Sequence, residues 1–278
     1  MSDRSEKYIY DPSWEGERKR LQSLERLNDP TTIAHFEAVG VAPGWTCLEV
    51  GAGAGSIARW LCNRVGPEGQ VVATDLDTRF LEDIDSPHLE LRRHDILEDE
   101  FESGDFDLVH ARFVLEHLSR YRDALARMIE ALAPGGWIVV EDVDFAAPIM
   151  ADPGERPGFP EESIAAAAEL TSLLLQLSKA RGIQADLGRR LPALLAMAGL
   201  EDVGAEGRTD FVWSGTEEAE IGRLSVGHVT KVAVESGLMS AEERARYMSL
   251  FTEPGVGSFS PLRFGAWGRK PKALSIGD

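Results

Sequence analysis

Apolar residues in the first third of the chain form short continuous runs that are separated by helical spacing. The runs over residues 47–50 and 70–75 are typical of strands that are buried on both faces of a sheet. Between them, Ile57, Leu61 and Val65 recur at intervals of four, which predicts a helix with one face packed on that sheet. The order strand, helix, strand predicts a parallel α/β sheet.

Turn residues and periodicity set the expected limits of the other elements. The sequence Asp29-Pro30 predicts a break between a charged N-terminal helix and a second helix that leads to the first strand. Pro134, Gly135 and Gly136 are expected to end one helix before the fifth strand begins. Helices are also expected over residues 119–133, 188–200 and 240–251, and strands over residues 89–95, 106–112, 137–143, 206–215 and 258–271.

A glycine-rich turn follows the first strand directly. Gly51, Gly53 and Gly55 occupy alternate positions, and Ser56 stands where a dinucleotide-binding GxGxxG turn would have its last glycine. Glycine permits positive φ angles and a close approach of the backbone to a ligand. A glycine turn of a parallel sheet without a ligand is the alternative, because a lone glycine motif is a weak signal.

Two acidic residues follow later strands in the positions that a nucleoside site requires. Asp75 ends the second strand, where a carboxylate can accept hydrogen bonds from both hydroxyls of a ribose. Its neighbour Asp77 is a candidate N-cap of the next helical turn. Asp95 follows the third strand and precedes Ile96. The glycine turn and the two acids therefore occur in the order of a nucleoside-binding α/β fold.

With these motifs, residues 30 to 145 resemble the class I S-adenosylmethionine-dependent methyltransferases, and within them the small-molecule group that is similar to the ubiquinone/menaquinone C-methyltransferases. The resemblance implies a doubly wound, mostly parallel seven-stranded Rossmann-like sheet with an antiparallel last strand. It also implies that S-adenosylmethionine is the cofactor. In the resembled family, the position of Asp95 holds the adenine amino group and that of Ile96 packs on the adenine ring. Glu49 matches an acid near the methionine end.

The expected site extends beyond these motifs. His110 and Arg112 end the fourth strand, where they could contact the methionine moiety or the acceptor, or serve only as structural residues. In similar enzymes the N-terminal segment closes over the cofactor, although Tyr10 and Trp14 could equally anchor a helix. The predicted cofactor-binding set is therefore Glu49, Gly51, Gly53, Gly55, Asp75, Leu76, Asp95, Ile96, His110, Arg112, Tyr10 and Trp14.

A general base is needed only if the acceptor must lose a proton, and His is the natural candidate. His110 and His228 are the candidate catalytic residues, while His117 is assigned a structural role. A metal site is not expected, because His110-Ala111-Arg112 replaces the metal-binding Asp of catechol-type relatives. The acids Glu141, Asp142 and Asp144 keep a cation as a minor alternative.

Two long helical stretches, over residues 162–182 and 217–236, exceed what the sheet requires and predict a helical cap. The expected division of the chain is an N-terminal helical segment that covers the cofactor site (1–30), a cofactor-binding core (31–150), and the end of the core sheet with cap insertions at about 161–182 and 217–236 (151–278).

Composition narrows the class of partner. The formal net charge of −18 over 278 residues opposes a nucleic-acid backbone, and no basic stripe is present. The first residues lack the apolar stretch of a signal peptide, and no run is long enough for a membrane span, so a cytoplasmic location without membrane contact is expected. Cys47 and Cys62 fit reduced core thiols. A homodimer is left open.

The expected function is methyl transfer from S-adenosylmethionine to an oxygen, nitrogen or carbon atom of a small, fairly apolar metabolite of specialised metabolism. One alternative is an enzyme on the same fold that does not transfer the methyl group. Another is a cofactor-binding regulatory protein without chemistry. An NAD-dependent oxidoreductase is disfavoured by Ser56 and by the lack of a second nucleotide motif.

Overall fold

The computed structural model describes residues 16–100, 104–145, 161–180 and 182–272, and it gives no side-chain description for residues 161–164. Tyr10 and Trp14 lie outside the described residues. The helices are α1 (Glu17–Val39), α2 (Ser56–Val65), α3 (Tyr121–Ala131), α4 (Glu161–Ala180), α5 (Leu187–Met197), α6 (Glu217–Glu235) and α7 (Ala241–Ser249), with short 3₁₀ turns η1 (Gly66–Glu68), η2 (Thr78–Phe80) and η3 (Leu115–His117). The strands are β1 (Thr46–Val50), β2 (Gln70–Asp75), β3 (Leu89–Arg93), β4 (Phe106–Arg112), β5 (Leu132–Asp144), β6 (Glu201–Arg208), β7 (Phe211–Trp213), β8 (Gly257–Phe259) and β9 (Leu262–Arg269).

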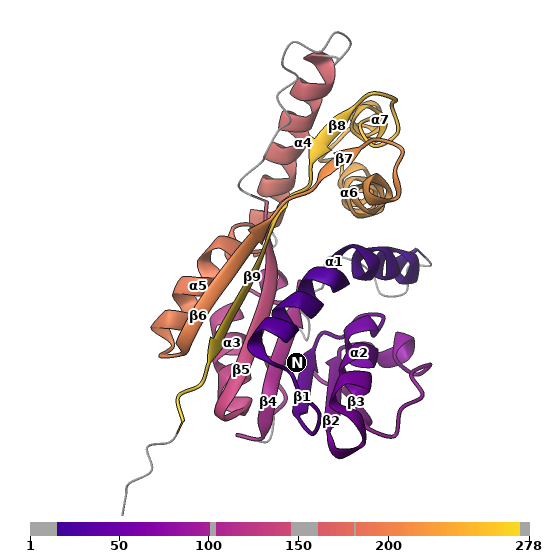
Figure 1. The fold of residues 1–278 in the computed structure, drawn as a ribbon. Coiled ribbons are helices and arrows are strands. Elements are labelled where there is room, and N and C mark those ends of the chain that lie inside the picture. Colours follow the sequence, from indigo (N-terminus) through magenta and orange to yellow (C-terminus); the bar gives the residue numbers. More distant parts are fainter. Residues whose placement is uncertain (1–15, 101–103, 146–160, 181, 273–278) are drawn as a thin grey trace, which may run out of the picture.

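The central sheet has seven strands in the order β3-β2-β1-β4-β5-β9-β6 (Figure 1). Neighbouring strands from β3 to β5 pair in parallel, whereas β9 is antiparallel to both β5 and β6. The strand order reverses at β1, so the carboxyl ends of β1 and β4 flank the crevice where ligands bind in open α/β sheets. This architecture confirms the predicted fold class, including the antiparallel last strand.

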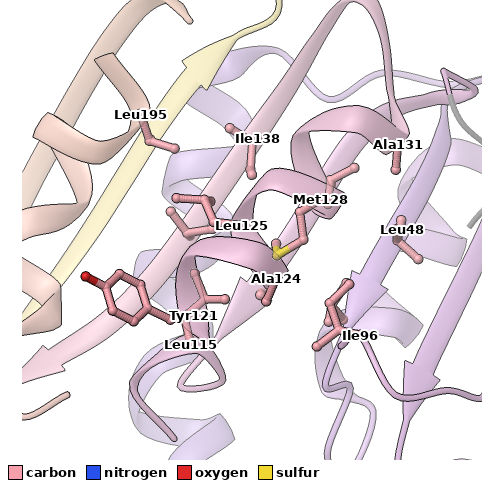
Figure 2. Close-up of a cluster of buried hydrophobic side chains, with 14 of the residues drawn as sticks. Leu48, Ile96, Leu115, Tyr121, Ala124, Leu125, Met128, Ala131, Ile138 and Leu195 are labelled. Carbon is pink, nitrogen blue, oxygen red and sulfur yellow. The ribbon is translucent and has the colours of Figure 1, made fainter. Parts of the chain in front are cut away.

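Each face of the sheet has its own hydrophobic core. On one face, buried residues of α3 and α5 pack on Leu48, Val109 and Ile138 (Figure 2). On the other, α1 and α2 pack on Cys47, Leu108 and Val139. Neighbouring residues of one strand therefore belong to different cores, because successive side chains along a strand point to opposite faces of the sheet. Both cysteines are buried and free, as predicted for core thiols.

The expected break at Asp29-Pro30 is wrong, because α1 is a single helix that continues through Pro30. Proline is tolerated at this point because it lies on the exposed side, where only a solvent-facing hydrogen bond of the helix is lost. On the opposite side, Asn28, Thr32 and His35 are buried and hold both halves of the helix in line. Consequently α1 crosses the expected division at residue 30.

The expected strand over residues 206–215 is two strands of different sheets. β6 begins earlier, at Glu201, and belongs to the central sheet, whereas β7 pairs only with β8. The chain changes sheets at Asp210, whose carboxylate pairs with Arg208 and Arg263 and whose amide donates to Ser260. These polar contacts, of which those with Arg263 and Ser260 join distant parts of the chain, are not encoded in the alternation of apolar residues, which explains the error.

The helical cap consists of α4, α6 and α7, which share a separate hydrophobic cluster around Leu170, Val229 and Tyr247. The two expected insertions correspond to α4 and α6. Ion pairs join α6 to α1, from Arg26 to Glu217 and from Lys19 to Glu220. The cap therefore rests on α1, and α1 in turn lies over the edge of the sheet (Figure 1).

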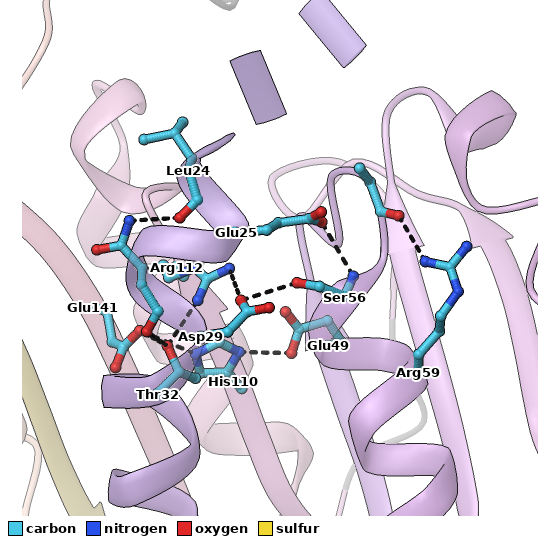
Figure 3. Close-up of polar contacts among 12 residues, drawn as sticks. Leu24, Glu25, Asp29, Thr32, Glu49, Ser56, Arg59, His110, Arg112 and Glu141 are labelled. Carbon is cyan, nitrogen blue, oxygen red and sulfur yellow. Dashed lines mark hydrogen bonds and ion pairs between the residues drawn. The ribbon is translucent and has the colours of Figure 1, made fainter. Parts of the chain in front are cut away.

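Buried polar contacts fasten α1 to the sheet (Figure 3). The carboxylate of Glu141, on β5, accepts from the hydroxyl of Thr32 at 2.5 Å and pairs with Nδ1 of His35 at 2.7 Å. His110, on β4, pairs with Glu49 through Nδ1 at 2.6 Å, and its Nε2 lies 3.8 Å from Glu141. Because His110 is fully buried and both carboxylates are nearly so, its imidazolium is the central cation of this network.

The protonation of His110 follows from these neighbours. Burial by itself lowers the pKa of His110, but Glu49 and Glu141 outweigh burial and raise the pKa to about 9. Burial likewise favours the neutral form of Glu141, yet the neighbouring imidazoles of His110 and His35 lower the pKa of this carboxyl. The network is therefore charged at neutral pH.

A pH dependence of stability follows from the raised pKa of His110. The stabilisation is fully present below the unfolded value of 6.5 and is lost as the pH rises through about 9. We expect the free energy of unfolding to fall by an amount on the order of 3 kcal/mol across this window, and we expect His110→Gln to lack this fall. Urea unfolding between pH 6.5 and 9.5 measures it. The control is His88→Gln, a change in the turn before β3, which should keep the parent's pH dependence. If the free energy of unfolding fell equally with pH in His110→Gln and in the parent protein, the assignment would be contradicted.

Candidate functional site

The glycine turn lies between the end of β1 and the start of α2. Gly51, Gly53 and Gly55 all have positive φ, of 71°, 59° and 87°. A Cβ at Gly51 would lie 2.4 Å from Val114, and one at Gly55 would lie 2.6 Å from Ile84. Both neighbouring segments therefore approach the turn so closely that only glycine fits.

Asp75 closes this turn from the side of β2. Its Oδ2 accepts from the amide of Gly53 at 2.9 Å, and its Oδ1 accepts from the amide of Asp77 at 3.0 Å. Burial raises the pKa of Asp75, whereas the two amides act in the opposite direction. Each carboxylate oxygen retains a further lone pair, so this side chain can accept hydrogen bonds from a ligand in the same position.

The alternative assignment of Asp77 as an N-cap is confirmed. Its side chain accepts from the amide of Arg79 at the start of η2, and it also pairs with the Arg79 guanidinium. The Arg79 hydrogen bond outweighs burial and lowers the pKa of Asp77. Asp77 is thus a capping residue, and only Asp75 of this pair contacts the glycine turn.

The residues expected around an adenine lie at the ends of β2 and β3. The side chain of Leu76 is exposed, with 52% of its surface accessible, although Leu is usually buried. Asp95 is half-buried and accepts from the amide of Leu97, while Ile96 belongs to the core beneath it. The carboxyl ends of neighbouring parallel strands meet at one edge, so these residues share the edge that carries Asp75.

α1 lies across the glycine turn and brings carboxylates that the sequence analysis did not select. Glu25 accepts from the amide of Ser56 at 3.1 Å, and Asp29 accepts from its hydroxyl at 3.0 Å (Figure 3). Asp29 also pairs with Arg112 at 2.9 Å. Burial raises the pKa of Glu25, against the lowering effect of the Ser56 amide. Arg112 thus links the end of β4 to the helix that covers the turn.

Two further acids are buried together, of which the sequence analysis named Asp142 only as an alternative cation ligand and did not select Glu116. Glu116, in η3, and Asp142, on β5, are at most 4% exposed, and the amide of Glu116 donates to Asp142 at 3.4 Å. Burial raises the pKa of Glu116 to about 7, and burial together with Glu116 raises that of Asp142. Burial also lowers the pKa of His117 to about 4.

The other candidates lie apart from the glycine turn. His228 is half-buried on α6, within the cap. Asp144 pairs with Arg189, and Glu141 is engaged by Thr32 and His35. Among the described residues, no group of three or more His, Cys, Asp or Glu side chains is arranged to hold a metal ion.

Comparison with known proteins identifies the domain. A family model described as a methyltransferase domain matches residues 48–138. The "Methyltransferase str3" of Strobilurus tenacellus is 36% identical over 116 residues, which cover 40% of this chain and 41% of that protein. The ubiquinone/menaquinone biosynthesis C-methyltransferase UbiE of Pseudomonas savastanoi pv. phaseolicola (strain 1448A / Race 6) is 32% identical over 121 residues, which cover 41% of this chain and 46% of that protein. The chain thus matches less than half the length of these curated relatives.

A solved structure supports the fold over nearly the whole chain. The phosphoethanolamine N-methyltransferase 2 of Haemonchus contortus, in complex with phosphomonomethylethanolamine and S-adenosylhomocysteine, superposes with a TM-score of 0.55. The superposition covers 97% of this chain and 60% of that chain at 16% identity. By the family model and its sheet topology, the chain carries a methyltransferase domain over residues 48–138 on the fold of solved S-adenosylmethionine-dependent methyltransferases.

Proposed function

We propose that the protein transfers a methyl group from S-adenosylmethionine to an oxygen, nitrogen or carbon atom of a small, fairly apolar metabolite. One observation carries the proposal. The Asp75 carboxylate accepts a hydrogen bond from the amide of Gly53, in a turn where a Cβ at Gly51 or Gly55 would clash with neighbouring side chains. This arrangement lies at the reversal of strand order, where a nucleoside binds in α/β folds.

The residues present fit the cofactor. Asp75 would accept hydrogen bonds from the ribose hydroxyls, while Asp95, Ile96 and the exposed Leu76 would hold the adenine. Glu49 and Arg112 would hold the methionine end, because one can pair with an ammonium group and the other with a carboxylate. When bound, the cofactor supplies an activated methyl group on a sulfonium.

The protein's own contribution is alignment and exclusion of water. α1 covers the glycine turn, and the cap rests on α1 through Arg26 and Lys19. His110 supports this arrangement from β4 by facing Glu49 and Glu141 on the two strands that flank it, β1 and β5. For His110 to act at the reacting atoms it would have to leave these carboxylates. The catalytic roles of His110 and His228 therefore remain predictions.

The class of acceptor is inferred from charge and from the relatives. A net charge of −18 disfavours nucleic acid, and the curated relatives include an enzyme named for ubiquinone/menaquinone biosynthesis. In the described part of the chain, no helix combines the length and apolar character that crossing a membrane requires. We propose that the acceptor is a small metabolite of specialised metabolism. We also propose that the protein acts in the cytoplasm.

Calorimetry with S-adenosylmethionine tests cofactor binding, and mass spectrometry with a methyl-labelled cofactor tests transfer to acceptors from cell extracts. We expect saturable binding and a labelled product. Bound cofactor should also raise the midpoint of thermal unfolding, since a ligand present at about 100 times its Kd stabilises the native state by about 2.7 kcal/mol. A protein that does not bind the cofactor under any condition would refute the proposal.

Substitution of the ribose acceptor tests the assigned site. We expect Asp75→Ala to weaken S-adenosylmethionine binding by more than tenfold, because a charged hydrogen-bond acceptor is lost. The matched control is Asp77→Ala, which removes a carboxylate two residues away that caps η2. Calorimetry should show a much smaller change for this control, and circular dichroism should show that both variants keep the fold. Unchanged affinity in Asp75→Ala would exclude the ribose assignment.

A further inference from the structure

α1 is held by different interactions along its length. Toward its carboxyl end, Thr32 and His35 contact the buried carboxylate of Glu141. In the same part of the helix, Phe36 is fully buried in the core. Toward its amino end, over residues 17–27, the buried side chains are polar and the three leucines are only half-buried. Because burial of apolar surface is the main source of stability, this amino-terminal arm (residues 17–27) is the more weakly held part of α1.

Ion pairs at the surface join the arm to the cap. Arg26 pairs with Glu217 at 2.5 Å, and the two side chains are 57% and 66% exposed. Lys19 lies 3.6 Å from Glu220. Both acids belong to the first turn of α6. Exposed ion pairs contribute little to stability and are screened by salt, so these contacts between the arm and the cap are readily broken.

The helix is weakened at the junction between the arm and the rest of α1. Pro30 has no N–H, so the carbonyl of Arg26 lacks the donor that an uninterrupted helix would supply. The Asn28 side chain donates to the carbonyl of Leu24 at 2.7 Å, and the Thr32 hydroxyl lies 3.3 Å from that of Asn28. Side chains that bond to main-chain carbonyls in this way compete with the helix and bend it. The main-chain bonding of α1 is therefore weakest where its attachment to the sheet begins.

The arm covers the glycine turn. A Cβ on Gly53 would lie 3.7 Å from Cδ2 of Leu21, so Leu21 lies against this turn. Glu25 accepts from the amide of Ser56 at the start of α2 (Figure 3). Gly53 is also the residue whose amide donates to Asp75. A ligand that binds to Asp75 at this turn therefore lies next to the arm.

We infer that the arm is a gate over the cofactor site, which opens when α1 bends at Pro30 and the ion pairs to α6 break. The inference rests on the proposed function, because it takes the glycine turn as the cofactor site. In the closed position Leu21 covers Gly53. In the open position the arm leaves the turn, while the part of α1 that follows Pro30 stays on the sheet through Glu141. Opening of the arm therefore limits both the entry and the release of S-adenosylmethionine.

A gate of this kind has a kinetic signature. The ion pairs between the arm and the cap are the same in the free and the loaded protein, so a change in them alters the rates of association and dissociation by the same factor and leaves the Kd almost unchanged. A residue that contacts the cofactor changes the Kd instead, mostly through the dissociation rate. The two rates together therefore distinguish a gate from a binding contact.

The substitution Arg26→Gln tests the ion pair to Glu217. In stopped-flow measurements with S-adenosylmethionine, both rates should rise roughly two- to fivefold, the range that an exposed ion pair provides, with the Kd changed by less than about twofold. High salt should bring the parent protein close to the rates of this variant. The matched control is Arg246→Gln, which removes a similarly exposed pair to Glu169 inside the cap. Rates in Arg26→Gln that equal those of the control would overturn the inference.

The substitution Pro30→Ala tests the hinge, because it restores the missing N–H donor. Both rates should fall by at least about tenfold, since proline weakens a helix interior more than any other residue. Pro192→Ala is the control, because Pro192 also lies inside a helix, α5, on the opposite face of the sheet. The control should keep the parent rates. An unchanged rate of cofactor release in Pro30→Ala would refute a hinge at this residue and with it the gate.

A cross-link tests whether the arm and the cap must separate. Cys47 and Cys62 are both buried, so a short bis-maleimide should react with thiols introduced by Arg26→Cys and Glu217→Cys. Before cross-linking, this double variant should exchange the cofactor faster than the parent protein, and after cross-linking it should exchange it more slowly. Each single variant, treated with the same reagent, is the control. Exchange that is equally fast before and after cross-linking would show that no separation is needed.

Hydrogen exchange measures the motion without cofactor. In the parent protein, amides of residues 17–27 should exchange at least about tenfold faster than those of residues 31–39, because local opening involves only the weakly held part of the helix. Pro30→Ala should slow exchange in residues 17–27 and leave residues 31–39 unchanged. Equal protection on both sides of Pro30 in the parent protein would contradict the gate.

These outcomes are separable from failure of the proposed function. If the protein does not bind S-adenosylmethionine at all, the proposed methyl transfer is refuted together with the role of the arm in cofactor exchange, even where hydrogen exchange shows that the arm opens. If the cofactor binds and its methyl group is transferred, but its rates respond to neither Arg26→Gln nor Pro30→Ala, only the gate is refuted.

Discussion

The carboxylate of Glu141 lies buried at the end of β5, where Thr32 and His35 of α1 and His110 of β4 face it. A buried carboxylate is stable only when paired and hydrogen-bonded. Glu141 therefore fixes the position of α1 over the edge of the sheet, and α1 brings Glu25 and Asp29 onto Ser56. The cap is attached to the same helix by ion pairs, so the glycine turn, α1 and the cap are connected through one buried charge network.

This network lies between two regions at the carboxyl ends of the parallel strands. On one side lie the glycine turn and Asp75, which suit a nucleoside with hydroxyl groups. On the other lies a pocket that is lined by His35 and Phe113. The loop after β4 contributes to both, since Val114 packs on Gly51 while Phe113 lines the pocket. A single strand end thus contributes residues to both regions.

Some errors in the sequence interpretation have a common cause. The alternation of apolar residues cannot show that Pro30 lies on the solvent side of a helix, nor that Asp210 gathers two arginines where the chain changes sheets. In both cases, contacts between residues far apart in the chain override a local signal. The contact of Glu116 with Asp142 was missed for the same reason, because it depends on the meeting of η3 and β5.

The sequence by itself determined the sheet core, the glycine turn and Asp75, because these features rest on local periodicity and on the need for positive φ within one strand–turn–helix unit. It also distinguished Asp75 from the capping residue Asp77 by position. Only the tertiary structure decided that α1 covers the turn and that His35 anchors α1 on the sheet through Glu141. No local pattern marks His35, since its role depends on Glu141, Gly265 and Trp267, which lie more than 100 residues away along the chain.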